Sequence, residues 1–322
     1  MTDKTKSSFY SAAYGGPGWQ ARTAAHSEEI GNIWGSCGIE NEWCLLEAVI
    51  LHSPGEELLT SLENPNKVQM LDRLDVGKAC EEHGKLVENY QSQGVKVIFV
   101  NPPDKPSPNQ MFCADLFAMT PEGAILSRPA STVRAGEERQ MARRLADNGI
   151  PILKTLTGNA TFEGADLLWL NRHHAILGKG LRTNQEAADQ IANLLEEIGV
   201  KLLSVDMPFG TMHLMGMLRI VDQNLALAWP RRTPYSAVNA LRQIGYEVNF
   251  LPEHEEFDQQ KAFNFVTLGP RKILMVAENP LARKYYESLD IECIETPGTE
   301  LSKAAGAVGC LTGVVQRSKS SW

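Results

Sequence analysis

The chain has 322 residues, which is enough for one large domain or two of ordinary size. Its hydrophobic content of 43% is ordinary for a globular protein. The sequence contains no apolar run of about eighteen residues, so we expect no transmembrane helix. The net charge of −8 argues against a nucleic-acid partner and mildly favours a cationic small-molecule ligand through electrostatic steering.

The first residues and the cysteines together predict a cytoplasmic protein. Residues 1–8 lack the apolar segment of a secretory signal. The six cysteines include no CxxC pair, and no Cys/His spacing is typical of a zinc site. We therefore expect reduced thiols, no metal and no other cofactor, and no association with a membrane.

In chain order, residues 1–40 are rich in Ser, Gly, Thr and Ala and predict an N-terminal arm at the surface. The apolar segment 47–52 predicts the first strand, the apolar periodicity of 67–93 predicts a long helix, and 95–100 predicts a buried strand. The prolines of 102–108 predict a rigid, extended loop.

A pattern of strand, strand, helix and strand then recurs along the chain. Its four copies begin near residues 112, 165, 213 and 263, with helices expected at 136–148, 184–199, 234–245 and 280–288. Residues 46–100 form part of a further copy, and the last strand is expected at 309–317. Because the spacing is typical of propellers and repeat arrays, residues 41–317 predict one α/β domain of five repeats, followed by a tail at 318–322.

The stretch from Thr161 to Asp166 places two carboxylates, Glu163 and Asp166, just before an apolar strand. The small residues between them allow close approach to the backbone, and Arg182 follows in the turn after the next strand. Two acids and an arginine around one strand pair suit a ligand with a cationic and an anionic end. The structural alternative is that Glu163 caps a turn and Asp166 forms an ion pair with Arg182.

Cys310 and His213 each lie at the expected start of a strand. Gly309 and Gly313 flank the cysteine, free its backbone and expose a sulfur that is strongly nucleophilic as a thiolate. His213 is the natural acid–base partner of such a cysteine. The alternatives are a buried core cysteine and a core histidine bonded to a carbonyl. On a strand, Met215 would point to the same face as His213.

Asp115 lies inside an apolar segment, where an aspartate is costly unless it is paired, and Arg134 lies beyond the next expected strand. Asp115, Glu163, His213 and Cys310 thus come from strand starts in four different repeats. In a propeller such strand ends converge on the axis, so we expect the four side chains to face one central cavity.

These motifs resemble those of the guanidine-modifying enzymes, namely the arginine deiminases, the dimethylarginine dimethylaminohydrolases and, more distantly, the arginine–glycine amidinotransferases. The resemblance covers residues 40–317. It rests on six segments in order: 53–58, 108–115, 162–166, 178–184, 212–214 and 309–312. It implies a five-bladed α/β propeller, in agreement with the five repeats.

The resemblance also implies an activity and three catalytic residues. The protein would be a hydrolase that cleaves the guanidino C–N bond of arginine or a substituted arginine through a covalent amidino-cysteine intermediate. Cys310 would be the nucleophile, and His213 the general acid and base. Glu163 would orient His213 and touch the substrate.

Four further residues would bind the small guanidino substrate. Asp115 would hold the guanidinium group, and Asp166 would meet an α-amino group. Arg134 and Arg182 would bind an α-carboxylate. The sequence leaves open whether the protein forms a homo-oligomer.

Two positions depart from the family pattern. Met215 stands where deiminases and amidinotransferases commonly carry aspartate, and Ala114 stands where dimethylaminohydrolases usually carry an additional acid. The guanidinium clamp is then one carboxylate short, which suits a substituted guanidine. The segment Asn41–Trp43 resembles a motif of the amidinotransferases, so transfer of the amidino group to an amine stays an alternative, as does a catalytically inactive binding protein.

Overall fold

The computed structural model describes residues 11–259 and 261–319, and this part of the chain forms five three-stranded sheets. In each sheet the middle strand pairs antiparallel with one neighbour and parallel with the other. The strand orders are β15-β1-β2, β3-β4-β5, β6-β7-β8, β11-β10-β9 and β12-β13-β14. The strands are β1 (Leu46–Leu51), β2 (Lys96–Phe99), β3 (Phe117–Thr120), β4 (Gly123–Leu126), β5 (Ile152–Thr155), β6 (Leu167–Asn171), β7 (His174–Lys179), β8 (Lys201–Asp206), β9 (Leu218–Asp222), β10 (Leu225–Ala228), β11 (Glu247–Phe250), β12 (Val266–Gly269), β13 (Lys272–Val276), β14 (Glu292–Thr296) and β15 (Gly313–Arg317).

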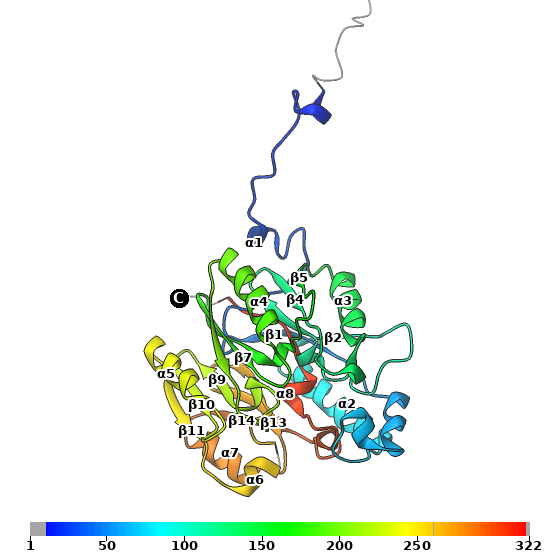
Figure 1. The fold of residues 1–322 in the computed structure, drawn as a ribbon, viewed down its shortest axis with the longest axis vertical. Helices are drawn as coiled ribbons and strands as arrows, with labels where there is room; N and C mark the ends of the chain where they lie inside the picture. Colours follow the sequence, from blue (N-terminus) through cyan, green and yellow to red (C-terminus); the bar gives the residue numbers. More distant parts are fainter. Residues whose placement is uncertain (1–10, 260, 320–322) are drawn as a thin grey trace, which may run out of the picture.

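A helix connects the two parallel strands of each sheet, because a parallel pair needs a crossover. These helices are α2 (Val76–Ser92), α3 (Glu137–Asp147), α4 (Gln185–Glu197), α5 (Tyr235–Ile244) and α7 (Pro280–Glu287). They lie around the outside of the molecule and bury one apolar face against the sheets (Figure 1). The short helices are α1 (His26–Glu29), α6 (Glu255–Gln259) and α8 (Val308–Leu311). In the described part of the chain, no helix is both long and apolar enough to cross a membrane.

The repeat of strand, strand, helix and strand is therefore confirmed, with one repeat built from both ends of the chain. The last strand, β15, pairs antiparallel with β1, so that Val314 lies opposite Val49. The segment before β1 adds to this edge, because the N–H of Gly38 donates to the carbonyl of Val315. Earlier residues, from 11 to about 28, extend away from the body of the protein (Figure 1). The first ten residues of the expected arm lie outside the described part.

The first strand of each repeat begins later than predicted. The segments predicted at 112–119, 213–221 and 309–317 each start with a short helical turn: η5 (Cys113–Asp115), η8 (Leu214–Gly216) and α8, respectively. Local hydrogen bonds satisfy the backbone there; for example, the N–H of Gly216 donates to the carbonyl of His213. Met215 lies in such a turn, so the argument that placed it on a strand beside His213 was wrong.

The helix predicted over 67–93 is shorter at its N-terminus. The separate turn η4 (Pro65–Val68) comes first, and α2 begins at Val76. The helix begins there because Asp75 is its N-cap residue. The Asp75 side chain accepts a hydrogen bond from the N–H of Lys78 in the first turn of the helix.

Two glycines give a test of this architecture. Gly123, at the start of β4, has φ +147°, and an added Cβ would lie 2.6 Å from the carbonyl oxygen of Pro151. We expect Gly123→Ala to lower the free energy of unfolding by about 1–3 kcal/mol, as measured by urea denaturation. Gly84, inside α2, has open space around its Cβ position, so Gly84→Ala should raise stability by about 0.5–1 kcal/mol. Equal effects of the two substitutions would contradict the fold described here.

Candidate active site

The candidate residues come from short turns that precede the first strand of each repeat. Asp115 ends η5, Asp166 ends η7 (Gly164–Asp166), His213 precedes η8, and Cys310 lies in α8. The turn at Gly164 packs so tightly that a Cβ there would lie 2.1 Å from the carbonyl oxygen of Phe117. Glycine at this position therefore lets two neighbouring repeats meet closely enough to bring their acids together.

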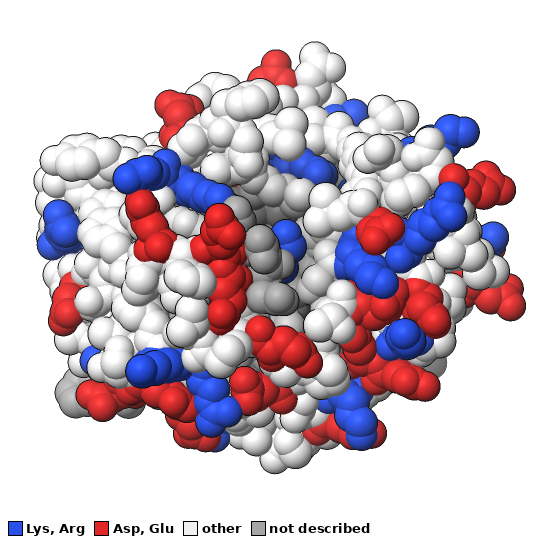
Figure 2. Space-filling model, turned by 90° about the horizontal axis from the view of Figure 1, so that it is seen from below, with Lys and Arg blue, Asp and Glu red and all other residues white. Residues whose placement is uncertain are grey.

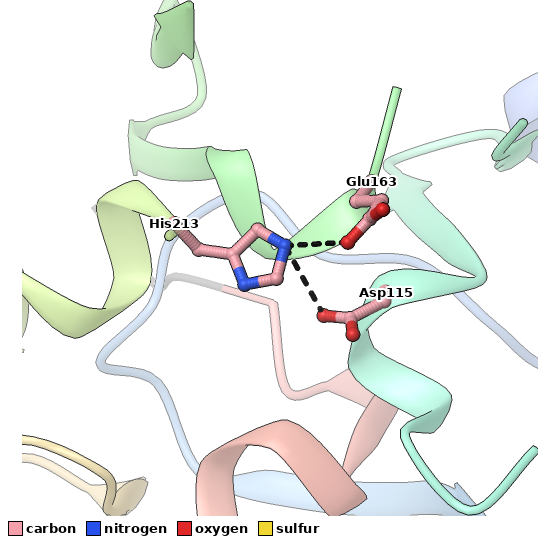
Figure 3. Close-up of side chains that lie close together, drawn as sticks. All are labelled: Asp115, Glu163 and His213. Atoms are coloured by element: carbon pink, nitrogen blue, oxygen red, sulfur yellow. Dashed lines mark hydrogen bonds and ion pairs between the residues drawn. The ribbon is translucent and has the colours of Figure 1, made fainter. Parts of the chain in front are cut away.

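Asp115, Glu163 and His213 form a buried cluster (Figure 3). The Nε2 atom of His213 lies 2.7 Å from Oε2 of Glu163 and 3.8 Å from Oδ1 of Asp115. Glu163 has no exposed surface, and the other two side chains are buried as well. An ionised carboxylate in such a place needs strong partners.

Two arginines supply those partners. Arg134 donates from Nη1 to Asp115 at 2.6 Å and from Nε to Glu137 at 2.9 Å, and its Nη1 also lies 3.5 Å from Oε2 of Glu163. Arg182 donates to Oε1 of Glu163 at 3.1 Å. The structure therefore shows both arginines bound to the acids of the site. Their expected contact with a carboxylate of the substrate stays a prediction.

The electrostatics of the cluster favour a charged His213 and an ionised Glu163. Burial raises the pKa of Glu163, but the hydrogen bond with His213 and the charges of Arg134 and Arg182 outweigh it and lower this pKa to about 2. Burial lowers the pKa of His213, but Asp115 and the hydrogen bond to Glu163 raise it to about 9. At neutral pH the imidazole can therefore donate a proton rather than accept one.

Asp166 lies behind this cluster and is almost completely buried. Its Oδ2 accepts a hydrogen bond from the Thr183 hydroxyl at 2.6 Å, and its Oδ1 accepts one from the N–H of Leu214 at 2.9 Å. The ion pair between Asp166 and Arg182 that the structural alternative assumed is absent from these contacts. The contacts favour a role for Asp166 in holding the backbone beside His213, whereas its expected contact with an α-amino group stays a prediction.

Cys310 is held by a residue that the sequence argument missed. The Nδ2 atom of Asn264 donates to Sγ of Cys310 at 3.0 Å, and Oδ1 of Asn264 accepts from the N–H of Cys310 at 3.1 Å. Burial and the charge of Asp115 raise the pKa of the Cys310 thiol, and the hydrogen bond from Asn264 partly offsets this rise. A nearby buried guanidinium, Arg219, also favours the thiolate.

The repeats contained the signal that would have found Asn264. Four repeats place Asp115, Glu163, His213 and Cys310 just before their first strands, and Asn264 precedes β12 of the fifth repeat. Because asparagine is uncharged, the residue type at this position did not by itself indicate a role in the site. Its equivalence to the other four positions was the available clue.

Cys310 opens on a hollow that it shares with some of the charged residues, which we call the polar hollow. Its lining includes Cys310, Asp115, Arg134, Arg182, Asn109 and Gln69. Figure 2 shows that one face of the molecule is hollowed near its centre, with acidic and basic side chains around the opening. Of the four side chains expected to face one central cavity, Cys310 and Asp115 line this hollow, whereas Glu163 and His213 do not.

The same cluster contains donor atoms that could hold a metal ion. One ligand atom each from Asp115, Glu163 and His213 lie within 4.8 Å of one another. Arg134 already donates to the carboxylate of Asp115, and Arg182 donates to that of Glu163. The carboxylates of the cluster therefore already bind cations that donate hydrogen bonds. The expectation that no metal takes part stays a prediction.

The pKa of His213 can be measured directly. In a Cys310→Ser variant without ligand, NMR titration of the imidazole should give a midpoint near 9. Because an unfolded histidine titrates near 6.5, the stability that protonated His213 contributes should be complete below about pH 6.5 and lost as the pH rises to about 9. Glu163→Gln should lower the midpoint, whereas Glu88→Gln on the exposed face of α2 should leave it unchanged. A midpoint near 6.5 with Glu163 present would contradict the arrangement.

Comparisons with known proteins found a matching family model and several relatives. The family model described as "N,N dimethylarginine dimethylhydrolase, eukaryotic" matches residues 65–235. The N(G),N(G)-dimethylarginine dimethylaminohydrolase of Pseudomonas aeruginosa is 25% identical over 268 residues, which cover 83% of this chain and 99% of that protein. The bifunctional arginine dihydrolase/ornithine cyclodeaminase ArgZ of Synechocystis is 28% identical over 73% of this chain and 33% of its own length.

Solved structures show the same fold. The P. aeruginosa dimethylaminohydrolase in complex with citrulline superposes with a TM-score of 0.70 at 23% identity, over 85% of this chain and all of that one. SxtG, an amidinotransferase from Microseira wollei, gives a TM-score of 0.72 at 17% identity, over 88% of this chain and 98% of that one. Because the family model spans more than half of the sequence, the chain belongs to the dimethylarginine dimethylaminohydrolase family.

Proposed function

We propose that the protein is a cysteine-dependent hydrolase that cleaves a C–N bond in the guanidino group of arginine or an N-substituted arginine. The observation that supports this most strongly is the shared hollow: a hydrogen-bonded cysteine, Cys310, opens on the same space as a carboxylate, Asp115, and two arginines. The relatives named above act on dimethylarginine or arginine. The polar hollow offers negative groups for a guanidinium and positive groups for a carboxylate.

In this proposal the five sheets form the blades of a closed α/β propeller. Residues 41–317 are its single domain, and the first strands of the blades surround the axis. The supporting observations are the identical strand orders of the five sheets and the pairing of β15 with β1. The turns before the first strands then carry the site residues, because they lie at the same end of each blade.

The first half-reaction forms a bond between sulfur and carbon. The guanidinium carbon is a weak electrophile, and Asp115, which lines the polar hollow, holds its N–H groups so that the carbon lies over Sγ of Cys310. A guanidinium bound beside the sulfur favours the thiolate, so substrate binding lowers the pKa that burial had raised. The thiolate attacks, and the C–N bond of the tetrahedral adduct breaks as His213 gives its proton to the departing amine.

The second half-reaction removes the covalent group. His213, now neutral, takes a proton from water, and the resulting hydroxide attacks the amidino carbon. The C–S bond breaks, which releases a ureido product such as citrulline and restores the thiolate of Cys310. Glu163 stabilises the imidazolium of His213 in each step through their 2.7 Å contact.

The structure weakens the sequence argument for the alternative, amidino transfer. In the segment Asn41–Trp43, Oδ1 of Asn41 accepts from the N–H groups of Trp43 and Cys44. Oε1 of Glu42 accepts from the N–H of Trp169. These contacts support the backbone, so the segment gives no reason to place an acceptor amine in the site.

A substrate panel tests the activity. Arginine, methylarginine and dimethylarginine are incubated with the wild type and with Cys310→Ser, and ammonia, alkylamine, urea and citrulline are scored. We expect citrulline with ammonia or alkylamine, and a loss of at least about 100-fold in Cys310→Ser, equivalent to about 2.7 kcal/mol of barrier. Mass spectrometry should detect an amidino adduct on Cys310. An added amine that acquires the amidino group would show a transferase instead.

Asn264 should control the reactivity of Cys310. Asn264→Asp keeps the shape of the side chain but places a negative charge beside Sγ, so it should raise the pKa of the thiol. The rate of alkylation by iodoacetamide at neutral pH should fall several-fold, and its pH midpoint should move upward. Asn224→Asp, on an exposed turn, adds the same charge elsewhere and serves as the control. An unchanged pH profile in Asn264→Asp would remove Asn264 from this role.

A further inference from the structure

A second hollow also opens on Cys310. It shares Met212, Ala305 and Cys310 with the polar hollow and also reaches His213. Its volume is about 230 Å³, whereas the polar hollow has about 20 Å³. A guanidinium carbon placed over the sulfur would therefore border both hollows.

The lining of the second hollow combines polar residues, among them Thr211 and Asn264, with a group of large apolar side chains, after which we call it the apolar hollow. Met215, Met217, Trp229 and Phe263 supply its walls. The rings of Trp229 and Phe263 lie 5.6 Å apart between centroids, a tilted arrangement that offers aromatic surface. Methionine side chains are polarizable and adapt to irregular apolar groups. These four side chains can bind a hydrocarbon or aromatic group, and the guanidinium of Arg232 already lies over the Trp229 ring, 4.3 Å from its centroid.

The position of His213 connects this hollow to the reaction. His213 lines the apolar hollow, and in the proposed function it gives its proton to the departing nitrogen. The departing nitrogen must then lie beside His213, so any group that it carries extends into the apolar hollow. Basic side chains, Arg232 and Lys261, also line this hollow, which disfavours a substituent that ends in a second cation.

We propose that the apolar hollow is the subsite for a bulky apolar substituent, aromatic or branched alkyl and larger than two methyl groups, on the departing nitrogen of the substrate. The inference rests on the proposed function and specifies its substrate class. It also accounts for Met215: the thioether belongs to the wall of this subsite, where a carboxylate would lie against the hydrocarbon of the substituent.

Gly216 gives a clean way to test the subsite. It lines the apolar hollow, its φ is not in the left-handed region, and an added Cβ would have no atom within 4 Å. A side chain at this position therefore grows into empty space rather than into the core. Gly216→Phe should fill the hollow, and Gly84→Phe, at an equally open glycine in α2, is the matched control.

The experiment compares kcat/KM for arginine and for its Nω-dimethyl, Nω-isobutyl, Nω-benzyl and Nω-(3-aminopropyl) derivatives. In the wild type and in Gly84→Phe, the isobutyl and benzyl compounds should be used at least as well as dimethylarginine, and the aminopropyl compound at least tenfold less well. In Gly216→Phe, the ratio of benzyl to arginine kcat/KM should fall at least tenfold. The enzyme could instead turn over arginine or dimethylarginine and use both bulky compounds at a tenfold lower rate. That result would refute the proposed subsite and leave the proposed function intact.

A binding measurement keeps the inference testable if the proposed function fails. If no guanidino compound is turned over, calorimetry with Cys310→Ser measures the Kd of arginine and of Nω-benzylarginine. Tighter binding of the benzyl compound, lost in Cys310→Ser with Gly216→Phe, would support the subsite. Equal Kd values, or an effect that Gly216→Phe does not alter, would refute it.

Discussion

The site depends on one buried carboxylate. Glu163 has no contact with solvent, and it meets an imidazolium and two guanidinium groups at once: those of His213, Arg134 and Arg182. Each of these charges would cost several kcal/mol to bury alone, so they are stable only as a set. Removing the carboxylate would leave cations facing one another in a low-dielectric space.

This constraint also explains the geometry around it. The acids must approach within a few ångströms although they belong to different repeats, and the helical turns before β3, β6 and β9 bring them there. Gly164 permits the contact between two of these turns, and the buried carboxylate of Asp166 fixes the backbone of the third through Leu214. The cost of burying Asp166 thus contributes to the placement of His213. A rigid frame of this kind keeps reacting groups oriented before the substrate arrives.

Much of this could be predicted from the sequence, because the signals were local. Strand and helix periodicity gave the five repeats, and the resemblance of the motifs identified the family and the seven candidate residues. The sequence could not predict where the strands begin or which side chains contact one another. The apolar segments that hold Asp115, His213 and Cys310 fit a strand as well as a turn followed by a strand, and only the packing of neighbouring repeats decides between them. Asn264 carries no charge, so its contact with the sulfur could not be foreseen from its residue type. Whether Arg134 contacts an acid of its own chain or a ligand depends on distances that no motif encodes.

The pairing of β15 with β1 has a consequence for folding during synthesis on the ribosome. The proposed nucleophile, Cys310, lies in α8, immediately before the last strand, and that strand completes the sheet that the first one began. During synthesis the edge of β1 that faces β15 has no partner until the C-terminal residues emerge. The acids, the histidine and the arginines are all made earlier, but the thiol joins them only at the end. A chain interrupted just before α8 therefore carries the charged residues without Cys310, and the site is complete only when the last repeat has been made.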